Sequence, residues 1–79
     1  IDQNLKKLSS CKIGDQVIFT AVTISDDDFL SFLTAKNLEL GKKIEILEIE
    51  KYDESMTVKV DDRKKILSKL VSEKILVKQ

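Results

Sequence analysis

The side chains of this sequence that are best suited to chemistry are three consecutive carboxylates, Asp26, Asp27 and Asp28. Carboxylate oxygens are ligands of hard divalent cations, so one or two of them could complete a metal site shared with another domain. They also stand between Ser25 and Phe29, where a helix is expected to begin, and a helix dipole favours negative charge in its first turn. We therefore interpret the triplet first as a helix cap and second as a set of candidate metal ligands.

Composition excludes most other site chemistry. The chain has no His and a single Cys, Cys11, which rules out a Ser-His-Asp triad, an imidazole metal site and a Cys-based zinc cage. Its two glycines, Gly14 and Gly41, lie too far apart to form a glycine-rich phosphate loop. We predict that the protein is not an enzyme and that the domain holds no cofactor tightly. Cys11 is interpreted as a small apolar residue of the core.

Charge and hydropathy limit the possible partners. Lys and Arg together number 14 and equal the 14 Asp and Glu residues, whereas nucleic-acid binding needs a basic excess that displaces counterions. No apolar run approaches the roughly 20 residues that cross a bilayer, and no signal-peptide pattern is present. We predict no direct contact with nucleic acid, no membrane insertion and a cytoplasmic location, with which the lone thiol agrees.

The elements that must position these residues are mostly strands. Alternation of apolar and polar residues predicts strands at about residues 15–24, 43–50, 56–60, 64–68 and 75–77. In the first two strands the apolar phase changes midway, which indicates a bulge or bend of the kind that closes a small barrel. Lys64 and Lys65 are interpreted as solvated strand-end residues, or as charges that protect an edge strand from unwanted pairing.

One helix of about residues 26–36 is predicted after the first strand. Ser25 and Asp28 have the spacing of a capping box, and Asn37 is expected to end the helix in the left-handed conformation. A further helical turn is expected at Lys69–Lys74. The residues of the main helix that should face the core by their spacing are Phe29, Phe32 and Leu33.

The order of these features resembles the FeoA-like domain. The segments that carry the resemblance are Leu8 to Asp15, Phe29 to Gly41, Ile44 to Leu47, Met56 to Val60, Ile66 to Ser68 and Glu73 to Val77. The family often has Gly-Leu where this sequence has Asn37-Leu38, and Asn tolerates the same left-handed backbone. The resemblance covers nearly the whole chain and implies a small five-stranded SH3-like barrel, mostly β, with one short α-helix inserted after strand 1.

Within this family, the sequence is most similar to the C-terminal SH3-like domain of diphtheria-toxin-repressor-type bacterial regulators, which depend on iron or manganese. The likeness is carried by the Ser25–Asp28 lead and the Tyr52–Val60 hairpin. It implies a non-catalytic module that contacts the DNA-binding and dimerisation domains of the same chain and tunes the response to divalent iron or manganese. Homodimerisation would run through those other domains. The resemblance also implies that Asp26, Asp27 and Asp28 stand where such modules supply ancillary metal ligands.

The chain begins with Ile1 and not with Met. We therefore expect residues 1–79 to form a single domain from the C-terminal part of a longer protein, with residues 1–7 as a polar lead-in. Two other functions stay open: a free-standing FeoA-type adaptor of the ferrous iron transporter, and an SH3-like peptide-binding or scaffold domain. The last is less favoured, because proline-rich recognition needs an aromatic-lined groove and the sequence has no Trp and one Tyr.

Overall fold

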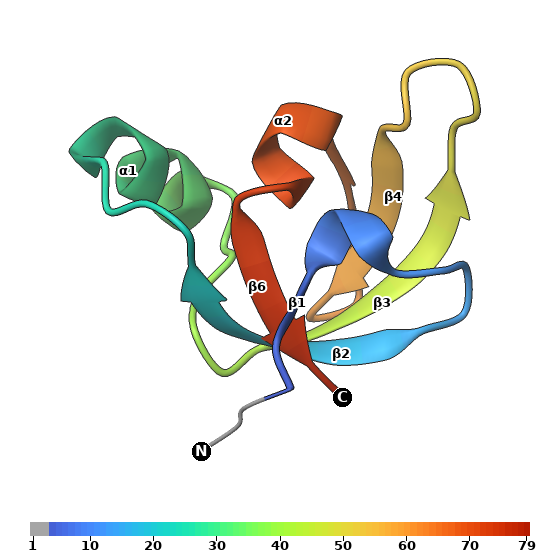
Figure 1. Ribbon diagram of the computed structural model, residues 1–79, viewed down its shortest axis with the longest axis horizontal. Coiled ribbons are helices and arrows are strands. Elements are labelled where there is room, and N and C mark those ends of the chain that lie inside the picture. Colours follow the sequence, from blue (N-terminus) through green and yellow to red (C-terminus); the bar gives the residue numbers. More distant parts are fainter. Residues whose placement is uncertain (1–3) are drawn as a thin grey trace.

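One antiparallel sheet runs through the molecule, and the computed structural model describes it over residues 4–79 (Figure 1). Its strands are β1 (Lys6–Lys7), β2 (Gln16–Val22), β3 (Lys43–Ile49), β4 (Met56–Val60), β5 (Arg63–Leu67) and β6 (Ile75–Lys78). They lie in the order β1-β6-β2-β3-β4-β5. The remaining elements are the 3-10 helix η1 (Leu8–Ser10) and the helices α1 (Asp27–Ala35) and α2 (Lys69–Ser72). The predicted mostly β fold, with one helix between the first two long strands, is confirmed.

The sheet has six strands and not the five that were predicted. The additional strand, β1, pairs Lys6 with Val77 and Lys7 with Leu76 of β6, within the segment expected to be a polar lead-in. Two adjacent lysines show no alternation of apolar and polar residues, so the sequence gives no sign of this strand. Residues 1–3 of the predicted lead-in lie outside the described residues. Within residues 4–79 the end strands β1 and β5 do not pair with each other, which leaves the barrel open between them.

Both predicted changes of apolar phase correspond to irregularities of the sheet. The pairing of β2 with β6 shifts register between Phe19 and Ala21, and the pairing of β3 with β4 shifts between Ile46 and Glu48. A bulge increases the local twist and bends the strand, so one sheet can curl around a common core. β4 stays regular, and its residues alternate between buried and half-buried positions as expected.

The curled sheet encloses an apolar core that η1 and α1 complete. Leu8 of η1 is fully buried, and Leu38 is buried directly after α1. The other buried apolar residues are Cys11, Val17, Phe19, Phe29, Leu33, Ile44, Ile46, Met56, Val58, Val60, Leu67, Ile75 and Val77. Because every long strand contributes to this set, the core lies along the concave side of the whole sheet.

Helix α1 begins one residue later than the capping box predicts. Asp26, and not Ser25, is the N-cap: its carboxylate accepts a hydrogen bond from the Asp28 N–H at 3.0 Å. The end of the helix is as predicted. Asn37 has φ 63°, its N–H donates to the Thr34 carbonyl, and the Leu38 N–H donates to the Leu33 carbonyl. These two bonds make a Schellman motif, which satisfies the last carbonyls of the helix.

The core face of α1 is narrower than predicted. Phe29 and Leu33 are buried, but Phe32 is 37% exposed and lies outside the core. The side chain of Lys36 covers the Phe32 ring, with its Nζ 5.5 Å from the ring centroid. A nine-residue helix on a small barrel touches it along one row of residues at i and i+4, so a residue at i+3 falls on the flank.

Candidate functional site

An apolar groove of about 520 Å³ lies between α1, β2 and the loop that follows the helix. In Figure 1 the helix stands beside the end of β2, at the margin of the sheet. The lining residues are Phe19, Thr20, Ala21, Val22, Leu30, Leu33, Thr34, Leu38, Glu39 and Leu40. Leu30 and Leu40 are 40% and 66% exposed, so the groove presents aliphatic side chains to solvent. Only one aromatic residue, Phe19, is among them, which does not favour recognition of proline-rich segments.

The groove follows from how the helix is anchored. Phe29 and Leu33 hold α1 to the core, and the Schellman turn places Leu38 in the core directly after it. Leu30 is one residue after Phe29, so helical geometry turns it about 100° away from the buried row. It therefore lines the groove, as Leu40 does, instead of packing into the core.

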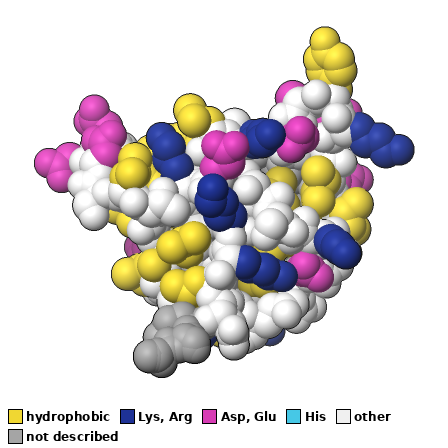
Figure 2. All heavy atoms as spheres, viewed as in Figure 1, with side chains coloured by type: hydrophobic (Ala, Val, Ile, Leu, Met, Phe, Trp, Pro, Cys, Tyr) yellow, Lys and Arg dark blue, Asp and Glu magenta, His cyan; other side chains and the backbone are white. Residues whose placement is uncertain are grey.

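The three predicted metal ligands lie at the start of α1, outside the lining of the groove. Asp26, Asp27 and Asp28 are all exposed, and Figure 2 shows acidic side chains gathered over the tip of α1. A second hollow on α1, lined by Asp27, shares Leu30 and Thr34 with the lining of the groove.

The structure uses this triplet as a helix start. One carboxylate oxygen of Asp26 already accepts the Asp28 N–H. No group of three or more Cys, Asp and Glu side chains within residues 4–79 is arranged to hold a metal ion. A cation bound at Asp27 or Asp28 would therefore draw most of its ligands from elsewhere. Oxygen ligands of this kind suit hard divalent ions.

Sequence reasoning missed a polar cluster that closes the other end of the helix. Asp61, in the turn between β4 and β5, accepts hydrogen bonds from Asn37 at 3.2 Å and from the Lys42 ammonium. The hydrogen bond from Lys42 is the main cause that lowers the pKa of Asp61 below its usual range. Asn37 and Asp61 lie 24 positions apart, so no local pattern could have joined them.

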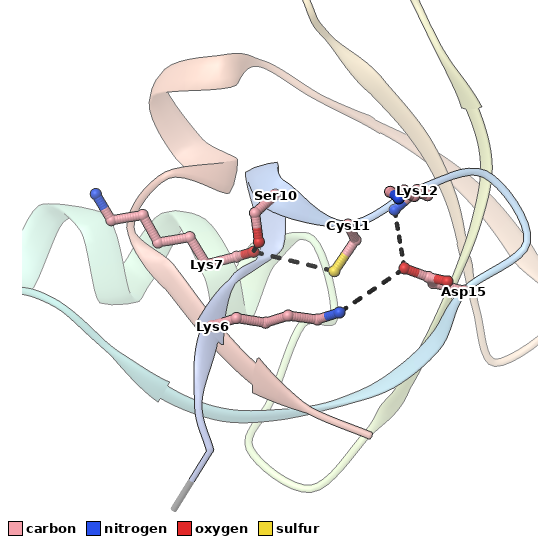
Figure 3. A network of polar contacts seen from close by, with 6 residues as sticks. All are labelled: Lys6, Lys7, Ser10, Cys11, Lys12 and Asp15. Atoms are coloured by element: carbon pink, nitrogen blue, oxygen red, sulfur yellow. Dashed lines mark hydrogen bonds and ion pairs between the residues drawn. The ribbon is translucent and has the colours of Figure 1, made fainter.

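Cys11 occupies a sheltered position near β1 (Figure 3). It is 4% exposed, and its Sγ lies 3.9 Å from the Lys7 carbonyl. Burial raises the pKa of the Cys11 thiol, so the reactive thiolate is disfavoured. Asp15 lies nearby, accepts a hydrogen bond from the Lys12 N–H at 2.8 Å and approaches the Lys6 ammonium at 3.9 Å. The interpretation of Cys11 as a buried apolar residue is confirmed.

The curled antiparallel sheet and the helix between its first two long strands define an SH3-like β domain, and the candidate sites on it are an apolar groove beside α1 and the acidic start of that helix. The model of the FeoA domain family matches residues 6–79. This chain belongs to the FeoA domain family.

Solved structures of the same fold come from two kinds of protein. A manganese-dependent transcriptional repressor superposes with a TM-score of 0.91 at 16% identity, over 100% of this chain and 44% of the repressor. An iron uptake regulatory protein, FeoA, superposes with a TM-score of 0.84 at 19% identity, over 94% of this chain and 96% of that protein. IdeR of T. acidophilum superposes with a TM-score of 0.86 at 23% identity, over 99% of this chain and 35% of IdeR.

The chain thus spans less than half the length of the repressors it resembles and nearly the whole length of the FeoA protein. At these identities the similarity establishes the fold. No curated protein matches the sequence. Within residues 4–79, no helix is long and apolar enough to cross a membrane.

Proposed function

We propose that this chain is a non-catalytic regulatory module of a metal-dependent transcriptional repressor. It docks through the groove beside α1 onto the DNA-binding and dimerisation domains of its own chain and tunes the response to divalent iron or manganese. The repressor is a cytoplasmic homodimer held together by those other domains. The observation that carries the proposal is the groove, because its exposed aliphatic residues Leu30 and Leu40 form a surface suited to a protein partner.

Two further observations support this function. Manganese-dependent repressors contain a domain of this fold that accounts for less than half of their length, so the domain accompanies others there. The charge of the chain is balanced, with 14 basic and 14 acidic residues, and this leaves DNA binding to another domain.

The groove is tested by a charge placed inside it in the whole repressor. Leu40→Glu puts a carboxylate on the docking surface without touching the core, since Leu40 is 66% exposed. Leu70→Glu is a matched control, because Leu70 is 63% exposed and does not line the groove. We expect Leu40→Glu to shift the metal concentration needed for DNA binding by roughly tenfold, the effect of about 1.4 kcal/mol. Equal metal responses of both variants would exclude the groove as the docking surface.

We propose a second role for the acidic start of α1, as a source of one or two ligands to a metal ion shared with another domain. Asp26→Asn, Asp27→Asn and Asp28→Asn, made singly, keep the size of each side chain and remove its charge. Each charge contributes about 0.3–1 kcal/mol to the helix, so the domain should stay folded. A ligand residue would show a weaker metal-dependent binding of DNA with an almost unchanged melting temperature. If all three variants respond to metal as the parent does, the triplet is only a cap.

A free-standing adaptor of a ferrous iron transporter is the second candidate function. It is favoured by the FeoA protein that this chain matches over 96% of that protein's length. The same groove would then bind the transporter, and Leu40→Glu would reduce ferrous iron uptake by cells while Leu70→Glu would not. The sequence of the gene that encodes this chain distinguishes the two functions. A winged-helix domain with His-containing metal sites encoded upstream would identify the repressor.

A further inference from the structure

One edge of the sheet has unused hydrogen-bonding groups. Within residues 4–79, β5 pairs only with β4, and it ends the order of strands. Asp61 and Asp62 both have positive φ, 55° and 65°, which makes the connection a two-residue type I′ turn. In such a hairpin the residues that flank the turn form a hydrogen-bonded pair, and hydrogen-bonded and open pairs then alternate. Lys64 and Ile66 belong to open pairs, so their N–H and C=O groups point away from β4.

The side chains on the outer face of this edge are mismatched in charge. Residues paired across strands lie on the same face, and the register places Glu45, Lys59 and Lys64 in one row. Glu45 and Lys59 are complementary neighbours, whereas Lys59 and Lys64 are like charges directly opposite each other. Within residues 4–79, Lys64 forms no ion pair that would compensate. A carboxylate beside Lys64 on an added strand would restore the alternation of charge.

The next outward-facing row holds Glu48, Thr57 and Ile66, and only Ile66, at the edge, is apolar. Ile66 pairs with Thr57 and is 67% exposed. It lines a hollow of about 270 Å³ together with Ile13, which is 62% exposed, Ile49 and the polar residues Glu48, Glu50, Ser55 and Thr57. An aliphatic side chain on an added strand would lie directly beside Ile66 and bury part of this surface. The edge is therefore complementary to a strand that carries an acidic residue and an aliphatic residue two positions apart.

A second copy of β5 does not meet this requirement. Arg63, Lys64 and Lys65 are consecutive, so two such strands side by side would bring six cations together in a small area. Lys65 is half-buried on the inner side of the edge, a placement that discourages unselective pairing of strands. A strand carrying carboxylates neutralises the same lysines.

We propose that the open edge of β5 binds an extended acidic peptide segment of a partner protein as a seventh strand of the sheet. The segment places a carboxylate beside Lys64, a second beside Lys65 and an aliphatic side chain beside Ile66. Its main chain bonds to the free N–H and C=O groups of Lys64 and Ile66, and its side chains supply the selectivity. This surface is separate from the groove beside α1, and the proposal holds for a repressor module and for a free-standing adaptor alike.

The test is a titration of the chain with a short peptide that has a Glu-Glu-Val-Glu-Glu core between threonines. The core satisfies the edge in either strand direction. Amide hydrogen exchange, followed residue by residue by NMR, should slow by about tenfold or more at Lys64 and Ile66 when the peptide saturates the chain. The amide of Lys65, which already bonds to β4, should change less. A peptide with Lys in place of every Glu is the control and should leave the exchange unchanged.

Two variants locate the binding. Lys64→Glu should weaken the acidic peptide roughly fivefold or more and allow the basic peptide to bind, because attraction becomes repulsion beside one cross-strand neighbour. Lys51→Glu makes the same charge change in an exposed loop and should have no effect. Ile66→Pro removes the backbone N–H of residue 66, which makes no hydrogen bond to β4, and should weaken peptide binding. Ile66→Val keeps this N–H and should bind the peptide normally. If Ile66→Pro unfolds the chain, the charge reversal at Lys64 decides.

Three results would overturn the proposal. The first is an absence of peptide binding at millimolar concentration. The second is binding that perturbs the groove residues Leu30 and Leu40 and leaves β5 unchanged. The third is a concentration-dependent dimer in which the amides of Lys64 and Ile66 are protected without peptide, since the occupant of the edge would then be a second copy of the chain.

Discussion

At the scale of single residues, Asp26 decides where the helix beside the groove begins. Its carboxylate accepts the Asp28 N–H, and its carbonyl accepts the Leu30 N–H at 2.9 Å. We predict that Asp26→Ala lowers the free energy of unfolding by about 1 kcal/mol, the usual loss when a capping side chain is removed. Urea denaturation followed by circular dichroism measures this difference.

Ser25→Ala is the matched control for this cap. Ser25 is exposed and lies outside the helix, so its loss should change the free energy of unfolding by less than about 0.5 kcal/mol. A larger loss from Ser25→Ala than from Asp26→Ala would mean that the capping box predicted from the sequence is the real start of α1.

Prediction of single residues from the sequence succeeded where a backbone conformation accepts only a few residue types. Asn37 was placed correctly, because few non-glycine residues adopt a positive φ. The N-cap was misplaced by one position, since Ser25 and Asp26 both cap helices well and only the backbone geometry chooses between them. The prediction that Phe32 faces the core was wrong for another reason. Helical spacing gives the direction of a side chain, but the width of the helix face that contacts the core depends on the shape of the core surface.

At the scale of elements, Asp61 ties the end of α1 and the following loop to the turn between β4 and β5. Lys42 and Asn37 both donate to its carboxylate, and this lowers the pKa of Asp61. A lowered pKa in the folded state gives stability that is present above the unfolded pKa of about 3.9 and is lost as the pH falls through the folded pKa. We predict that Asp61→Asn loses less stability than the parent between neutral pH and about pH 3.

Thermal melting across this range measures the difference. Asp62→Asn is the control: it lies in the same turn with a similar φ, and it forms no ion pair within residues 4–79. Its melting temperature should follow the pH dependence of the parent. Identical pH profiles for Asp61→Asn and the parent would show that the tie between helix and hairpin does not stabilise the fold.

Strands and helices with a clear alternation or helical spacing of apolar residues could be predicted from the sequence. Their arrangement in space could not. The change in the alternation of apolar and polar residues within β2 and β3 predicted both bulges, because a bulge moves the following apolar residues to the other phase. β1 has two residues and no alternation, and only its pairing with β6 makes it a strand. The groove arises between β2, α1 and the loop after it, so no single segment carries its pattern.

At the scale of the whole molecule, a chain of 79 residues has a thin core, and every buried position should matter. Leu8 lies in η1, before the long strands in the sequence, yet it is fully buried in the same core. We predict that Leu8→Ala lowers the free energy of unfolding by about 2–5 kcal/mol, a large part of the total for a small domain.

Chemical denaturation gives this value, and Leu70→Ala is the control. Leu70 is 63% exposed in α2, so its truncation should cost less than about 0.5 kcal/mol. A similar small loss from Leu8→Ala would mean that the segment before β2 is an appendage and not part of the core.

We propose that other domains of a repressor cover the groove beside α1, and hydrogen exchange tests this docking. The experiment compares residues 27–40 in this chain alone and in the proposed repressor, with the β3–β4 loop at residues 50–55 as an internal reference. We predict that exchange within residues 27–40 is slower by about tenfold or more in the repressor than in this chain alone, while exchange in the reference loop is unchanged. Equal exchange of residues 27–40 in both forms would contradict it.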